Sequence, residues 1–281
     1  MRIIQADEIT KAIREMCIQS NLYMSEDMKD AIISARKDEE GSSLASQILG
    51  QLEENLKVAD ELQIPICQDT GMTVVFAEIG QEAAVEGGLL RDAINEGIRQ
   101  GYTEGYLRKS VVGDPVERRN TGDNTPGIIH FDIVPGDRLT LTVAPKGAGS
   151  ENMSRLYMLK PSDGLDKVKQ VVLSTVEEAG PNACPPLVVG VGIGGNFEEC
   201  ALLSKKALTR DINVRSSLPW AVDLEKELLD SINATGIGPA GLGGKTTALA
   251  VNIEAYATHI ACLPVAVNLC CHVNRHVRRV L

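Results

Sequence analysis

The stretch of residues 64–71 places several reactive groups next to one another. It reads Ile-Pro-Ile-Cys-Gln-Asp-Thr-Gly, and so offers the thiol of Cys67, the amide of Gln68, the carboxylate of Asp69, a hydroxyl and a turn glycine. A helical pattern precedes it and a strand-like run follows it, so these groups lie on a connection between two elements. Binding and catalytic residues are found disproportionately on such loops. We therefore expect a functional site here.

Two more cysteines stand in similarly abrupt settings. Cys184 comes directly before two prolines, which remove two backbone donors in succession and exclude regular structure, and Cys271 lies between Cys270 and His272. Three thiolates from three separate loops could hold an iron–sulfur cluster and leave one iron without a protein ligand. Such an iron is a Lewis acid that can polarise a substrate carboxylate and hydroxyl while water is added or removed.

Five short motifs follow one another in a fixed order. They are CQDTG from Cys67, NTGDNTP from Asn120, KGAGSEN from Lys146, NACPP from Asn182 and the tail from His259 to Cys271. On these motifs the chain resembles the α subunit, or α region, of the iron–sulfur-dependent fumarate hydratase and tartrate dehydratase family, the class I fumarases. The resemblance implies a hydro-lyase with a [4Fe–4S] cluster that catalyses the reversible hydration of fumarate to malate. The alternative is an L-tartrate dehydratase α subunit, although the KGAGSEN motif resembles fumarase-type members more closely.

The same resemblance implies which residues hold the cluster. Cys67, Cys184 and Cys271 match its three protein ligands. The family has a histidine twelve residues before the last of these cysteines, and the spacing from His259 selects Cys271 over Cys270.

Substrate binding and proton transfer are implied for five further positions. Gln68, Arg108 and Gly149 match residues that hold the dicarboxylate. Asp69 and His259 match residues that orient the substrate hydroxyl or exchange protons with it, which are general acid–base roles. Small residues around Gly149 would also let the backbone approach a ligand closely.

The choice of Arg108 is made against two other arginines of the same polar segment. Bidentate binding of a carboxylate requires a planar guanidinium, which Arg118 and Arg119 also carry. Arg108 follows Tyr106-Leu107, and the family's substrate arginine follows a similar pair, so Arg108 is the match.

Composition limits the compartment and the partners. The chain has 281 residues, seven cysteines and a formal net charge of −10. An odd number of cysteines without a secretory signal favours reduced thiols, and no apolar run is long enough to span a membrane. We expect a soluble cytoplasmic protein that does not bind nucleic acid, because that binding requires clustered cations.

The hydrophobic patterns predict an α/β fold: a helical N-terminal leader over residues 1–63, integrated with a mixed α/β catalytic domain over residues 64–281 that carries the cluster ligands on loops. Strands are predicted over residues 73–79, 127–134 and 138–143, and the last two are expected to pair as a hairpin across a Pro-Gly-Asp turn. Helices are predicted over residues 89–102, 165–178 and 198–208. Two apolar strands are expected around His259.

A different class of function competes for the glycines at residues 190–195. They match a dinucleotide fingerprint, with a strand before them, a helix after them and Asp211 about twenty residues further on. A dinucleotide-binding oxidoreductase is thus the alternative, although residues 209–219 read as loop and the glycines are better explained by close strand-to-helix packing. Residues 243–247, Gly-Gly-Lys-Thr-Thr, resemble the end of a phosphate-binding loop, but Pro239 replaces its first glycine.

The remaining features are interpreted as structural. Cys17, Cys200 and Cys262 are predicted core residues, and the basic segment 272–279 is interpreted as a solvated end. Single-chain members of the family continue into a second region with further basic residues and a threonine. We therefore expect a separate β subunit to complete the active site, in a hetero-oligomer or a homodimer that binds a small dicarboxylate.

Overall fold

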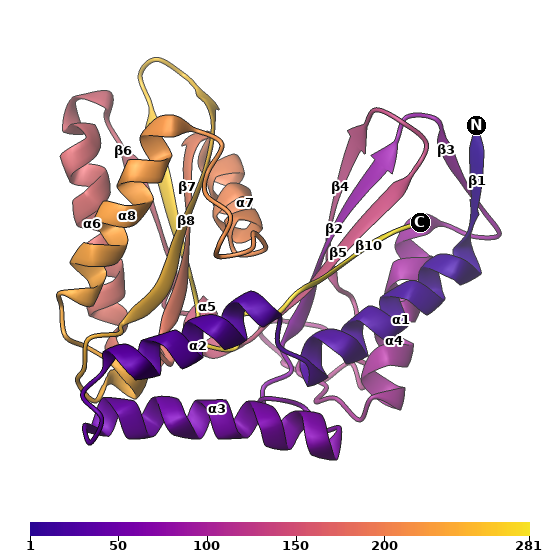
Figure 1. Ribbon diagram of the computed structural model, residues 1–281. Coiled ribbons are helices and arrows are strands. Elements are labelled where there is room, and N and C mark those ends of the chain that lie inside the picture. The colour runs from indigo at the N-terminus through magenta and orange to yellow at the C-terminus, as the bar shows by residue number, and fades with distance from the viewer. The chain divides into compact units, whose positions relative to one another are not determined.

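The computed structural model describes every residue from Met1 to Leu281 and divides the chain into two compact units. Unit 1 comprises residues 1–24, 56–148 and 275–281, and unit 2 comprises residues 25–55 and 149–274. Each unit has its own four-stranded sheet and its own apolar core (Figure 1). The predicted α/β class, with a helical N-terminal region before mixed sheets, is confirmed. The predicted boundary at residue 63 stays a prediction.

The N-terminal region is mainly helical. Its elements are β1 (Arg2–Gln5), α1 (Ala6–Leu22), α2 (Glu26–Asp38) and α3 (Leu44–Leu62). In α1 the apolar residues recur at helical spacing, and Ile9, Ile13 and Met16 are completely buried. No helix of the chain is both long enough and apolar enough to cross a membrane.

The sheet of unit 1 has the order β10-β5-β2-β4. Its strands are β2 (Met72–Gly80), β4 (Ile128–Val134), β5 (Leu139–Lys146) and β10 (Val277–Val280). A separate pair is formed by β1 and β3 (Ala83–Glu86). Helix α4 (Leu90–Glu104) packs closely on α1, since an added Cβ at Gly97 would lie 2.6 Å from the Cβ of Ile13.

The predicted hairpin between β4 and β5 is wrong. Strand β2 lies between them, parallel to β4 and antiparallel to β5. The reason is burial: residues 74–77 of β2 are all buried and therefore take an inner position, whereas Ile133 of β4 is 69% exposed at the sheet edge. The Pro-Gly-Asp turn still reverses the chain, but the reversal spans the width of β2.

The interpretation of residues 272–279 as a solvated end is also wrong. Residues 277–280 form β10, which pairs antiparallel with β5. Arg279 forms an ion pair of 2.7 Å with Glu15, and this pairing lowers the pKa of the Glu15 carboxyl group. Arg275 is 96% buried, since its exposed fraction is 4%.

The sheet of unit 2 has the order β6-β9-β7-β8. Figure 1 shows α6 and α8 on one face of this sheet and α7 on the other. The strands are β6 (Arg155–Leu159), β7 (Leu187–Gly195), β8 (Ala248–Thr258) and β9 (Leu263–Cys270). The helices are α5 (Ala148–Glu151), which begins in unit 1, α6 (Gly164–Ala179), α7 (Phe197–Ala207) and α8 (Pro219–Asn233). Short 3₁₀ turns lie at Pro161–Asp163, Gly180–Ala183 and Pro239–Gly241.

The glycines of residues 190–195 serve the packing of α7 on β7. An added Cβ at Gly190 would lie 2.2 Å from the carbonyl oxygen of Ser204, and one at Gly192 would lie 2.0 Å from that of Cys200. These glycines belong to the strand itself, and the helix fills the space in front of them. The predicted packing role is confirmed, and no room is left there for a pyrophosphate, which argues against the dinucleotide-binding alternative.

The segment that resembles a phosphate-binding loop is occupied by a carboxylate of the chain itself. The backbone N–H groups of Lys245 and Thr246 donate to Oε1 of Glu39 at 2.7 and 2.9 Å. Glu39 is buried and is the C-cap residue that follows α2. The donors that would bind a phosphate are therefore already used.

Replacing Gly192 by alanine tests the packing of α7 on β7. We expect Gly192→Ala to destabilise the protein by about 3 kcal/mol, because the new methyl group meets backbone atoms that cannot move independently. Gly41→Ala is the control, since no atom lies within 4 Å of the added Cβ. Thermal unfolding of both variants measures the difference, and equal melting temperatures would contradict the close contact.

Candidate functional site

The loop that carries Cys67 begins where α3 ends. The N–H of Ile66 donates to the carbonyl oxygen of Asn21 at 2.9 Å and so ties the start of the loop to the end of α1. Cys67 is half-buried, and the backbone N–H of Asp69 donates to its Sγ at 3.4 Å. The side chain of Gln68 is exposed, with Oε1 3.4 Å from the same sulfur. These contacts fix the thiol relative to the turn.

Asp69 is held by backbone groups on both oxygens of its carboxylate. Oδ1 accepts from the N–H of Gly71 at 3.0 Å, and Oδ2 accepts from the N–H of Ala148 at 2.9 Å. An added Cβ at Gly147 would lie 3.0 Å from Oδ2, so a side chain there would crowd the carboxylate. The CQDTG and KGAGSEN motifs, far apart in sequence, therefore meet at Asp69.

Arg275 supports this turn from a buried position. Its Nη2 donates to the carbonyl oxygen of Asp69, while its Nε and Nη1 make no hydrogen bond. Sequence reasoning missed this residue because a basic residue near the end of the chain is ordinarily solvated. A buried guanidinium beside Asp69 supplies positive charge to the turn in a chain that is strongly acidic overall.

Two further residues that sequence reasoning missed hold the turn by hydrogen bonds to its carbonyl oxygens. The hydroxyl of Tyr102 lies 2.7 Å from the carbonyl oxygen of Thr70, and Nδ2 of Asn124 donates to that of Gly71 at 3.1 Å. Both side chains are completely buried, and burial raises the pKa of Tyr102, so the phenol stays protonated. The sequence could have identified Asn124, because it belongs to the NTGDNTP motif. Nothing in the sequence distinguishes Tyr102 from the other residues of an apolar helix face.

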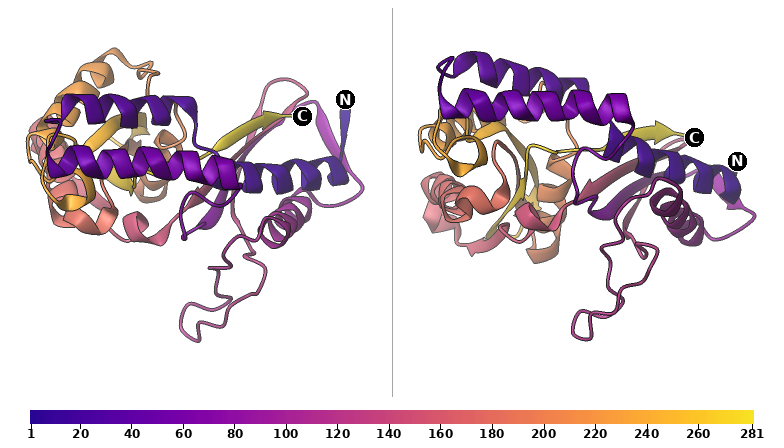
Figure 2. Two further views of the ribbon diagram at one scale, coloured as in Figure 1. Left: turned by 60° about the horizontal axis from the view of Figure 1, so that its bottom comes forward. Right: turned by 90° about the horizontal axis from the view of Figure 1, so that it is seen from below.

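Arg108 is attached to the same turn through its backbone. The N–H of Arg108 donates to Oγ1 of Thr70 at 2.9 Å, and the same hydroxyl donates to the carbonyl oxygen of Arg108 at 3.2 Å. The guanidinium is exposed and forms no ion pair with the chain. Arg118 and Arg119 lie further along the loop of residues 105–126, which projects from unit 1 (Figure 2), and Arg119 lies 3.5 Å from Glu117. Arg108 is thus the arginine bonded to the turn.

In unit 2 the structure brings the Cys184 loop next to the Cys271 segment. The carbonyl oxygen of Cys184 accepts from the N–H of His272 at 3.4 Å and lies 3.2 Å from its Nδ1. The reason is topological, since β7 begins near Cys184, β9 ends at Cys270, and these strands pair antiparallel with Val188 opposite Cys270. The backbone of Cys184 is left-handed, with φ of 55°, so the loop turns sharply there.

The remaining thiols differ in burial. Cys17, Cys200 and Cys270 are buried, and burial raises the pKa of Cys17 to about 12. A hydrogen bond with Cys270, together with burial, raises the pKa of Cys271. Cys262 is only half-buried in the β8–β9 turn, so its assignment to the core is wrong: the apolar run that contains it enters the sheet only at residue 263.

Gly149 and His259 lie in open surroundings. An added Cβ at Gly149 would meet only the carbonyl oxygen of Asn182, at an ordinary 3.6 Å. His259 is exposed in the β8–β9 turn, where its Nδ1 accepts from the N–H of Ala261 at 3.2 Å. Strand β9 has 8 residues, so His259 and Cys271 lie at opposite ends of it, about 25 Å apart at the usual rise of a strand. Unit 2 therefore does not bring these two together.

A comparison with known families decides the class of the protein. The family model described as fumarate hydratase (fumerase) matches residues 10–280. The chain belongs to the fumarate hydratase family. This membership makes it a hydro-lyase, and it confirms the resemblance inferred from the five motifs.

Individual relatives are similar over nearly their whole length. A chain of Methanocaldococcus jannaschii, provisionally named L(+)-tartrate dehydratase subunit alpha, is 43% identical over 274 residues, which cover 95% of each chain. The L(+)-tartrate dehydratase subunit alpha of Escherichia coli strain UTI89 is 33% identical over 273 residues, 96% of this chain and 89% of the relative. That of strain K12 is 32% identical over the same length.

Two glycine substitutions test how closely the chain packs around Gly71 and around Gly149. Gly71→Ala should destabilise the protein by about 2 kcal/mol or more, because Gly71 has φ of +76° and an added Cβ would lie 2.7 Å from the backbone of Lys146. Gly149→Ala should leave the melting temperature unchanged, because its methyl group has space. Differential scanning calorimetry measures both, and a large loss of stability in Gly149→Ala would contradict the open surroundings of that residue.

Proposed function

We propose that this chain is the α subunit of a hydro-lyase that adds water to, or removes it from, a four-carbon dicarboxylate. The observation that carries the proposal is the CQDTG turn, where a thiol, an amide and a doubly hydrogen-bonded carboxylate are held in fixed positions. The backbone of Arg108 is hydrogen-bonded to the same turn, and its guanidinium forms no ion pair with the chain. Recognition and protonation of a hydroxy acid require a positioned carboxylate and a cation, and the turn together with the segment bonded to it carries both.

The proposed cofactor is a [4Fe–4S] cluster with Cys67, Cys184 and Cys271 as ligands. The donor set fits, since all three are cysteines that form no disulfide, all three lie on loops, and the segments of Cys184 and Cys271 are hydrogen-bonded to each other. When bound, the cluster supplies an open iron that acts as a Lewis acid.

The residues of the chain would divide the remaining work. Gln68, Arg108 and Gly149 would hold the dicarboxylate, with the planar guanidinium of Arg108 on a carboxylate and Gly149 offering close approach of the backbone. Asp69 would exchange a proton with the substrate hydroxyl; both its oxygens already accept N–H groups, so its remaining lone pairs point in fixed directions. His259 is proposed as a second proton-transfer group. Because strand β9 separates it from Cys271 by about 25 Å, it would act in the site of a second copy of the chain.

Two substrates are candidates. The description of the family favours hydration of fumarate to malate, and the names of the relatives favour dehydration of L-tartrate. We also propose a β subunit as partner, because the relatives are named as alpha subunits.

Turnover of the two substrates tests the function. We expect anaerobically reconstituted chain to convert fumarate slowly by itself and much faster once its β subunit is added, because further cations of the site would come from that subunit. Loss of fumarate absorbance and formation of oxaloacetate from L-tartrate are measured in parallel. Activity on tartrate alone would replace the first candidate by the second, and no activity on either would contradict both.

Iron content tests the ligand set. After anaerobic reconstitution we expect about four iron atoms per chain and a broad visible absorption. Cys67→Ser, Cys184→Ser and Cys271→Ser should each abolish that absorption, because a hydroxyl is a poor replacement for a soft thiolate.

Cys262→Ser is the matched control, since this half-buried thiol lies in the β8–β9 turn. It should retain the iron of the wild type. Normal iron content in any of the three ligand variants would remove that cysteine from the set.

Replacing the two proposed proton-transfer groups should lower kcat while iron content stays unchanged. For Asp69→Asn and His259→Asn we expect a loss of about 100-fold or more, the usual contribution of a general acid or base. Stopped assays of the reconstituted enzyme measure kcat and KM separately. An active His259→Asn enzyme would restrict this residue to its hydrogen bond with Ala261.

A further inference from the structure

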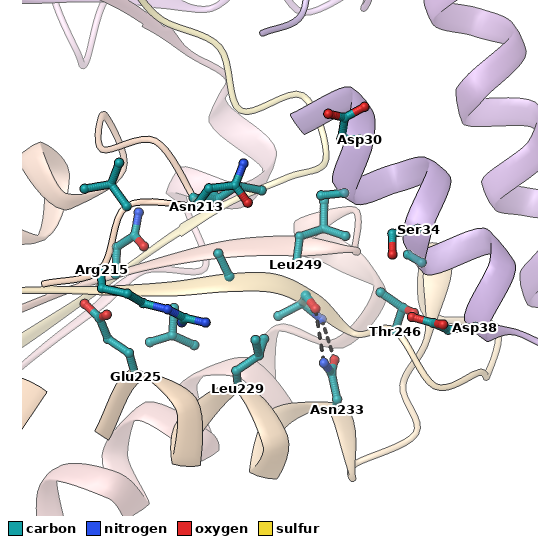
Figure 3. A pocket seen from close by; sticks show the side chains of 18 residues that line it. Asp30, Ser34, Asp38, Asn213, Arg215, Glu225, Leu229, Asn233, Thr246 and Leu249 are labelled. Carbon is teal, nitrogen blue, oxygen red and sulfur yellow. Dashed lines mark hydrogen bonds between the residues drawn. The ribbon is translucent and has the colours of Figure 1, made fainter. Parts of the chain in front are cut away.

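Unit 2 contains a cavity that involves none of the residues proposed for hydration chemistry. It has a volume of about 440 Å³ and is lined by α2, α8, the first part of β8 and the loop of residues 212–215 (Figure 3). This volume falls within the range of about 300–1,000 Å³ that is usual for small-molecule sites.

One wall of the cavity is the outer edge of β8. This strand pairs only with β7, so its other edge must be satisfied in another way. At one end, Asn233 accepts from the N–H of Ala248 at 2.9 Å and donates to its carbonyl oxygen at 3.2 Å, as the dashed lines of Figure 3 show. At the other end, the N–H of Ile253 donates to Glu225 and its carbonyl oxygen accepts from Arg210. Side chains thus take the place of a neighbouring strand at both ends.

Between these capped ends the backbone of Val251 has no such partner. Alternate residues of a strand direct their backbone groups to the same side, so the N–H and C=O of Val251 point away from β7 as those of Ile253 do. No side chain or loop of the chain is hydrogen-bonded to them. Val251 lines the cavity, which therefore presents one free donor and one free acceptor in the arrangement that the N–H and C=O of one extended residue of a peptide complement.

Opposite charges lie on different walls of the same cavity. The guanidinium of Arg215 forms no ion pair and extends into the cavity in Figure 3. Asp30 and Asp38 line the cavity from α2, and neither carboxylate has a partner in the chain. A ligand that satisfies both walls carries an anionic group and a cationic group.

We propose that this cavity binds a short peptide with free termini. Its carboxylate would pair with Arg215, the N–H and C=O of its central residue would exchange two hydrogen bonds with Val251, and its ammonium group would face Asp30 and Asp38. A dicarboxylate would leave the two aspartates facing a like charge, and a metal cation would leave Arg215 unpaired. The site is therefore distinct in ligand chemistry from the proposed active site and does not depend on the cluster.

Calorimetric titration of the full chain with triglycine tests the proposal. We expect one site per chain, with binding weakened about tenfold or more by Arg215→Gln and by Asp38→Asn, because each removes one charge-assisted contact. Lys226→Gln is the control, since it removes an exposed charge on α8 outside the cavity. Triglycine acetylated and amidated at its ends should bind much more weakly than the free peptide.

The position of the peptide is tested by amide resonances of ¹⁵N-labelled protein. At a triglycine concentration that half-saturates the wild type, the Val251 resonance should shift in the wild type and much less in Arg215→Gln. Absence of triglycine binding at millimolar concentration would overturn the proposal. Binding that is unchanged in both charge variants, or that leaves Val251 unshifted, would also overturn it, because the peptide would then lie elsewhere.

Discussion

The geometry of the candidate site in unit 1 depends on how the polar backbone of one tight turn is satisfied. The turn of residues 67–71 cannot use a helix or a sheet for its hydrogen bonds, and a buried backbone group without a partner is costly. The carboxylate of Asp69 accepts hydrogen bonds from two backbone N–H groups. Side chains of Tyr102, Asn124 and Arg275 each donate to a carbonyl oxygen of the turn. Each partner comes from a different part of unit 1, so the thiol of Cys67 is positioned by the whole unit.

In unit 2 the main constraint is the close packing of helix α7 on strand β7. Gly190 and Gly192 let the backbone of α7 approach β7 directly, and the core of valine, leucine and isoleucine side chains fills the other face of the sheet. With β7 fixed in this way, the chain enters it just after Cys184 and leaves β9 just before Cys271. The adjacency of these two cysteine segments is thus a consequence of strand pairing.

Periodicity and turn residues were enough to predict most elements but not the long-range relations between them. The helix of residues 165–178 and the strand of residues 73–79 were found because their apolar spacing is local. The insertion of β2 between β4 and β5 was missed because it depends on which strand is buried on both faces, a property of the assembled sheet. The site shows the same division: motif residues were identified, whereas the buried support from Tyr102 and Arg275 becomes visible only when distant segments meet.

The way the chain passes between the two units has a consequence for folding during synthesis. Strand β10, which forms one edge of the sheet in unit 1, pairs with β5 only after all of unit 2 has been made, since residues 149–274 lie between them. Unit 2 in turn needs α2, which is synthesised long before its sheet. Contacts between residues so distant in sequence form slowly. On the ribosome, β5 therefore has an unpaired edge while residues 147–276 are synthesised, and during that interval this edge is exposed to wrong strand pairing.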